Sequence, residues 1–171
     1  MKAFSQLFDR FSHAMHVISG MILVSMMFVT LADVLVRLLF KLTDGDIDLT
    51  FIGGVELIKY GLLMMVLFAL PYSIGRSQVI VDLFTENLSA RMKAILEGIY
   101  MFGFVALGGG MSYRFMHAVE QSQMTGETTQ DLLIPLYYFY AVSAFATAVL
   151  CVAALLISLR CLFFWKGDKV S

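Results

Sequence analysis

The three histidines are the first side chains in this sequence that could do chemistry. His13 and His16 lie at the start of one apolar stretch, and His117 follows a different one. Two axial ligands must face the same iron, and we expect these histidines at opposite membrane surfaces, so they predict no haem. His13 and His16 alone are spaced to share a metal, but this spacing is also typical of histidines at a membrane interface. We therefore expect no metal and no other cofactor.

Four of the charged residues within or beside apolar stretches fall into two closely spaced pairs. Asp33 and Arg37 are spaced i, i+4, and Glu56 and Lys59 are spaced i, i+3, so each pair shares a helix face. A charge at the centre of a bilayer costs about 2.5–3.5 kcal/mol on insertion scales, so each needs a reason. We interpret the four as a patch near the outer surface that binds another membrane subunit or organises the bundle. The alternative is that they reach the lipid headgroups or pair within the bundle.

Small residues gather in the third apolar stretch, at Gly103, Gly108, Gly109 and Gly110. Glycine lets a second helix approach closely, which is how helices associate in lipid. No polar groups that could bind a ligand converge there, so we predict helix packing. The sequence also lacks a Ser/His/Asp set or a phosphate-binding glycine loop in a plausible context, and we expect no enzyme.

The elements that carry these residues are four apolar segments. Of the 171 residues, 60% are hydrophobic and 15% are charged, with a mean hydropathy of +0.83, which is far more apolar than a soluble domain. Each segment approaches or exceeds the roughly 20 residues that cross a bilayer. The sequence predicts an all-α integral membrane protein, with residues 1–171 as one transmembrane domain and spans at about 14–40, 55–75, 94–116 and 132–159.

The distribution of Lys and Arg predicts the orientation. Basic residues occur at both ends of the chain and in the second loop, at Arg76, Arg91 and Lys93. The first loop has one lysine against three aspartates, and the third, from His117 to Asp131, has no Lys or Arg. Because basic loops stay in the cytoplasm, we predict cytoplasmic termini and outward-facing first and third loops.

Two amphipathic segments and one aromatic cluster are expected at the inner membrane surface. The amino end spaces Phe4, Leu7, Phe8 and Phe11 as one helix face, which predicts a short interfacial helix and no cleavable signal peptide. The second loop, around residues 79–88, predicts another amphipathic helix. The carboxyl end of the fourth span is followed by interfacial anchors at Phe163, Phe164, Trp165 and Lys166.

A transporter working alone would be expected to show repeated halves and helices broken at mid-membrane. Here both prolines, Pro71 and Pro135, lie near span ends, and no inverted repeat is visible. The physical interpretation is a four-helix membrane scaffold that works with a partner. Two other hypotheses are a non-haem membrane anchor of a respiratory enzyme and a self-sufficient homo-oligomeric channel.

Several short motifs, in order along the chain, resemble one known family. They comprise Asp33-Val34 with Arg37, Glu56 at the start of the second span, Val79-Ile80-Val81-Asp82, Gly126-Glu127-Thr128-Thr129, and Ile134-Pro135. Over essentially its whole length the chain resembles the small permease subunit, the DctQ-like component, of tripartite ATP-independent periplasmic (TRAP) transporters.

The resemblance implies a three-part system in the bacterial inner membrane. A periplasmic substrate-binding protein captures an organic acid anion, and a large permease (M) subunit imports it with sodium. The small subunit would act as a scaffold in the lipid bilayer, in a one-to-one complex with the large permease, without a substrate site or a nucleic-acid partner. Asp33, Arg37, Glu56 and Lys59 would organise the bundle or the permease interface, and Gly126, Glu127, Thr128 and Thr129 would touch the binding protein.

Overall fold

The computed structural model describes residues 2–43, 53–74 and 90–163. They form four helices: α1 (Lys2–Leu42), α2 (Gly54–Ile74), α4 (Ala90–Thr125) and α5 (Leu136–Phe163). Within the described ranges there is no β-strand, and the only β-type pairing is an isolated bridge between Thr128 and Pro135. All four helices are long and apolar enough to cross a membrane. The prediction of an all-α membrane protein with four spanning helices is confirmed.

Helix α1 is continuous from its amphipathic start into its apolar part. No glycine or proline interrupts the chain between Phe11 and Ile18, so nothing in the sequence ends the first helix there. The amino-terminal segment that we predicted as an interfacial helix is therefore the first part of α1. The second predicted amphipathic helix, around residues 79–88, lies outside the described residues.

Helix α4 continues past the predicted end of the third span. It ends at Thr125, so most of the predicted third loop is helical. Between His117 and Thr125 there is again no glycine or proline. Gly126 then ends the helix: its φ of 67° is in the left-handed region, and its N–H donates to the carbonyl of Ser122 at 3.0 Å. The loop between α4 and α5 is shorter than the sequence predicted for this reason.

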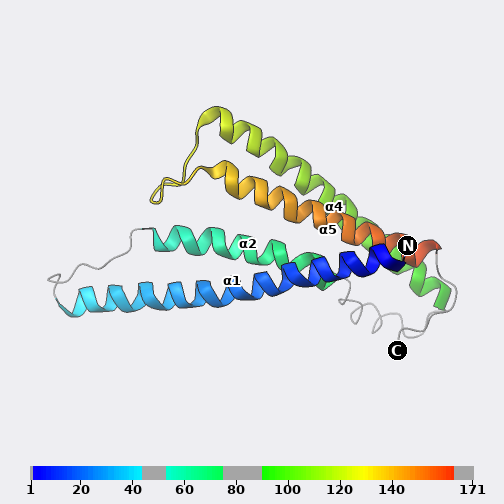
Figure 1. Cartoon of the computed structure of the whole chain (residues 1–171), viewed down its shortest axis with the longest axis horizontal. Coiled ribbons are helices and arrows are strands. Elements are labelled where there is room, and N and C mark those ends of the chain that lie inside the picture. Colours follow the sequence, from blue (N-terminus) through cyan, green and yellow to red (C-terminus); the bar gives the residue numbers. More distant parts are fainter. Residues whose placement is uncertain (1, 44–52, 75–89, 164–171) are drawn as a thin grey trace.

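The helices lie side by side in the order α1, α2, α5, α4 (Figure 1). Two hairpins, α1 with α2 and α4 with α5, meet where α2 contacts α5. Among the described residues the backbone of α4 lies close to that of α5 alone, and its buried Met101 shares an apolar cluster with Leu150 of α5 and Ile74 of α2. We use the name loop end for one end of this row. It is the end at which α1 and α4 finish and at which α2 and α5 begin.

The core follows α5, which has neighbours on both sides. One buried cluster joins three helices through Met15, Leu67, Ala146 and Val149. Half of the most apolar stretch of α5 is buried, whereas none of that of α1 is. Large apolar side chains such as Phe28 and Leu31 are about 60% exposed on α1. A surface of this kind is suited to lipid or to another membrane subunit.

Candidate functional site at the loop end

The carboxylate of Glu56 joins the two hairpins at the loop end. It accepts hydrogen bonds from three successive backbone N–H groups of the α4–α5 loop, those of Gln130 at 2.8 Å, Asp131 at 3.0 Å and Leu132 at 3.0 Å. Successive N–H groups that point to one place form an anion-binding nest, and bonds to an ionised carboxylate are stronger than neutral ones. We call this contact the Glu56 latch. It connects residues that are more than seventy positions apart.

The α4–α5 loop, residues 126–135, is itself closely bonded. The N–H of Thr129 donates to the carbonyl of Ile134 at 2.9 Å, and the N–H of Ile134 donates back to the Thr129 hydroxyl at 3.0 Å. The N–H of Leu136 donates to the carbonyl of Glu127 at 3.0 Å. Thr129 is buried at 2% exposure. These bonds hold the loop as a small hairpin whose tip faces Glu56.

Two further features adapt the loop tip to α2. Leu133 adopts a φ of 53°, a strained conformation for a leucine that the surrounding bonds must maintain. Leu132 lies directly against Gly53, where a Cβ atom would overlap with its side chain. A side chain at position 53 would require the Leu132 side chain to shift.

The four charged residues singled out in the sequence have different partners. Arg37 donates through Nε to Asp33 at 2.8 Å, and its side chain is 56% exposed. Lys59 places its ammonium 5.4 Å from the ring centroid of Tyr60. Among the described residues no ion pair joins the Asp33–Arg37 pair to Glu56 or Lys59. The structure therefore does not bring the four into a single charged cluster.

The glycines of α4 differ in what they face. A Cβ at Gly108 would stand 3.0 Å from the backbone nitrogen of Cys151, and one at Gly109 would lie 3.6 Å from its Sγ atom. At Gly103 and Gly110 a Cβ would meet nothing within 4 Å among the described residues. Gly108 is therefore the point at which the backbones of α4 and α5 approach closely.

Polar side chains support this close approach along the α4–α5 interface. Ser112 donates to the carbonyl of Ala144 at 3.2 Å, and Ser158 donates to that of Gly98 at 3.1 Å. Between them, the thiol of Cys151 donates to the carbonyl of Val105 at 3.4 Å. Helices in lipid commonly associate through small residues and such interhelical bonds.

The histidines lie at the two ends of the row. His13 and His16 pack their rings against Tyr72, with centroids 5.1 and 4.9 Å apart. His117 is on α4 near the loop end, 3.9 Å from Glu120. No group of three potential metal ligands occurs within the described part of the chain. Of the predicted interfacial anchors, Phe163 is the last residue of α5, while Phe164, Trp165 and Lys166 lie outside the described residues.

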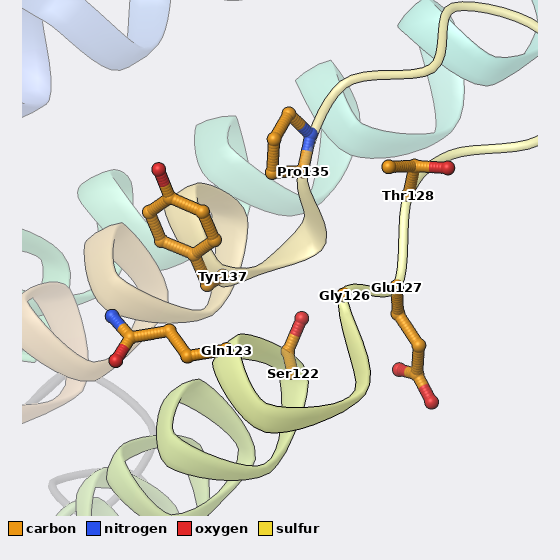
Figure 2. A pocket seen from close by; sticks show the side chains of 7 residues that line it. All are labelled: Ser122, Gln123, Gly126, Glu127, Thr128, Pro135 and Tyr137. Carbon is orange, nitrogen blue, oxygen red and sulfur yellow. The ribbon is translucent and has the colours of Figure 1, made fainter.

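A pocket of about 390 Å³ opens where α4 ends and α5 begins (Figure 2). Its floor includes Ser122, which is 2% exposed and whose hydroxyl has no hydrogen-bond partner among the described residues. In Figure 2 this hydroxyl is directed toward the turn at Gly126, with Tyr137 on one side of it and Glu127 on the other. The remaining lining residues are Gln123, Thr128 and Pro135.

Sequence reasoning identified Glu56 and the segment from Gly126 to Thr129 but treated them as separate. Nothing in their spacing relates them, because the pairing is created by the fold. The donors to Glu56 are backbone groups, which carry no residue signature. Ser122 was not predicted as a functional residue, since a lone serine in a helix gives no signal.

Comparison with known families identifies one match. Residues 26–164 match the family described as tripartite ATP-independent periplasmic transporters, DctQ component. No curated protein and no solved structure is matched. The family match includes α2, α4 and α5 entirely, residues 26–42 of α1, and the loop that forms the latch. The chain therefore belongs to the DctQ component family of the tripartite ATP-independent periplasmic transporters.

Proposed function

We propose that this chain is the small membrane subunit that scaffolds the large permease of a TRAP transporter. In this proposal the large permease imports an organic acid anion with sodium, and a periplasmic binding protein delivers the anion. The observation that carries the proposal is the family match across residues 26–164. The open row of four helices supports it, because α1 leaves a broad apolar surface for a larger membrane protein.

The site of contact with the large permease is proposed on α1. The Asp33–Arg37 pair lies on this helix, and Arg37 remains 56% exposed after pairing. A guanidinium at that position can accept a further partner from another subunit, since its planar fork offers five donors. The exposed apolar residues on the same helix would bury their surface against that subunit.

The proposed orientation places the loop end in the periplasm and both termini in the cytoplasm of a bacterial cell, with the chain in the inner membrane. It is supported by the positions of Lys and Arg in the sequence. The Glu56 latch and residues 126–129 would then face the soluble binding protein. This subunit would hold the docking surface still while the large permease moves.

A labelling experiment tests this orientation. With Cys151 and Cys161 replaced by serine, a single cysteine is introduced by Met124→Cys, at a side chain that is 88% exposed. We expect a membrane-impermeant maleimide to label it in intact spheroplasts. Ser77→Cys, in the second loop, should be labelled only after the membrane is permeabilised. The opposite pattern would reverse the proposed orientation.

Removing the guanidinium of Arg37 tests the role of α1. In the assembled system we expect Arg37→Ala to lower uptake roughly two- to fivefold, because a charge-assisted contact within the membrane complex is lost. The loss should come from a smaller amount of intact complex. If the Arg37→Ala complex formed in normal yield but bound substrate or sodium more weakly, the scaffold role would be wrong.

Purification of the tagged chain in mild detergent tests the proposal as a whole. We expect one larger polytopic protein in a one-to-one complex, identified by intact mass. Recovery of homo-oligomers alone, in a detergent known to preserve membrane complexes, would favour the channel hypothesis. Recovery of a respiratory enzyme would favour the membrane-anchor hypothesis.

A further inference from the structure

We propose that the pocket at the loop end binds the side chain of an arginine or lysine presented by an extracytoplasmic protein. The pocket is the one described above, lined by Ser122, Gln123, Gly126, Glu127, Thr128, Pro135 and Tyr137. The inference rests on the proposed function for the side of the membrane and the kind of partner. The chemistry of the ligand is argued from the pocket alone.

The backbone donors around the pocket are largely occupied. Glu56 receives the N–H groups of residues 130–132, and the N–H groups of Gly126, Thr129 and Ile134 are bonded within the loop or to the end of α4. Pro135 has no N–H to offer. The remaining donors are the neutral side chains of Ser122, Gln123, Thr128 and Tyr137 and the amino end of α5. No Lys, Arg or His is among the described residues that line the pocket, so a carboxylate or phosphate would find no cationic side chain to bind it here.

The acceptors, by contrast, face outward. Glu127 and Thr128 are exposed at the rim of the pocket. The carboxyl end of α4 and the amino end of α5 both lie beside it, so their opposite partial charges offset each other and the side-chain charges decide the local field. From Phe115 to Leu159 the chain has no Lys or Arg, while it carries Glu120, Glu127 and Asp131. The local charge thus favours a cation.

The interior of the pocket completes the argument. The Ser122 hydroxyl is unpartnered among the described residues, which costs free energy, and because it is shielded from solvent a ligand reaches it only after a local shift of the pocket lining. Tyr137 contributes a half-buried aromatic ring beside this hydroxyl, which packs against the ring of Tyr138 with centroids 4.1 Å apart, and an aromatic face that remains open attracts guanidinium and ammonium groups. With its volume of about 390 Å³ the pocket is far larger than a bare metal ion and has room for a long side chain.

The test uses the full chain in detergent micelles with ring-¹³C tyrosine. The Tyr137 signal is assigned by its loss in Tyr137→Phe. N-acetyl-arginine-N-methylamide serves as the probe, and the corresponding citrulline compound serves as its neutral analogue of nearly the same shape. We expect the arginine compound to shift the Tyr137 signal with a saturable titration curve and the citrulline compound to leave it unchanged at equal concentration.

Three variants locate the site. We expect Glu127→Gln to weaken binding of the arginine compound about five- to tenfold, because it removes a charge-assisted contact. Ser122→Ala should weaken it about threefold, since it removes a single neutral hydrogen bond. Glu120→Gln, which changes the charge equally on α4 but outside the pocket, should change it less than about twofold.

Each alternative outcome would overturn the proposal. An equal response to the citrulline compound would show that charge is not recognised. If Glu120→Gln weakened binding of the arginine compound as much as Glu127→Gln does, the effect would be due to general surface charge. If sodium chloride alone shifted the Tyr137 signal in the same way, the pocket would be a site for inorganic cations. Because the titration uses this chain alone, it can fail while the complex with the large permease still forms, and the reverse also holds.

Discussion

Replacing Glu56 by glutamine is expected to release the α4–α5 loop from α2. The amide is uncharged and has one acceptor oxygen instead of two, so it cannot accept from Gln130, Asp131 and Leu132 as the carboxylate does. We expect amide hydrogen exchange at residues 130–132 to accelerate by about tenfold or more, because protection there depends on these bonds. Exchange in the middle of α5 should remain unchanged.

A matched variant separates this effect from a change in charge. Glu120→Gln also removes one negative charge near the loop end, but Glu120 is 66% exposed and is contacted by His117. We expect Glu120→Gln to leave amide hydrogen exchange in the α4–α5 loop unchanged. If Glu56→Gln had as little effect as Glu120→Gln, the loop would be held by its internal bonds, and the latch would have no role in its position.

The second large effect is expected from a branched side chain at Gly108. The Cβ atom of Gly108→Val would meet the backbone of Cys151 at 3.0–3.1 Å, and a backbone cannot move aside as a flexible side chain can. We expect α4 and α5 to separate, with a loss of about 1–3 kcal/mol of stability, as is usual for overpacking. Thermal unfolding of the purified chain in detergent, followed by circular dichroism, measures this loss.

The neighbouring glycines provide the control. Gly103→Val and Gly110→Val place the same side chain on the same helix, at positions where a Cβ meets nothing within 4 Å. They should unfold within about 0.5 kcal/mol of the unaltered chain, as surface substitutions usually do. An equal loss in all three variants would mean that valine harms the helix itself and that close contact with Cys151 is unimportant.

The helices were predictable because their signal is local. Each span is a long run of apolar residues, and both the all-α class and the four crossings follow from length and composition alone. The predicted ends of the helices were less accurate. The apolar run fades near Met116, but helix formation does not depend on apolarity, so α4 continues through polar residues until Gly126.

The candidate site was predictable only in part, because its contacts are not local. Glu56 was noticeable as a charge in an apolar segment, yet its partners are backbone groups far along the chain. Among the four glycines of α4 that the sequence analysis singled out, the sequence could not indicate which one faces α5, since adjacent residues point to different sides of a helix. Ser122 becomes noticeable only once burial has removed it from solvent.

The central place of α5 has a consequence for biosynthesis. Because the backbone of α4 lies close to that of α5 and not to those of α1 or α2 among the described residues, the three described helices before α5 would be a hairpin and a third helix that packs little against it. Helix α5, which is synthesised after these three, is the one that joins them. A chain that stops before Leu136 would thus lack its joining helix, and membrane quality-control proteases should remove it before it can occupy a place in a larger complex.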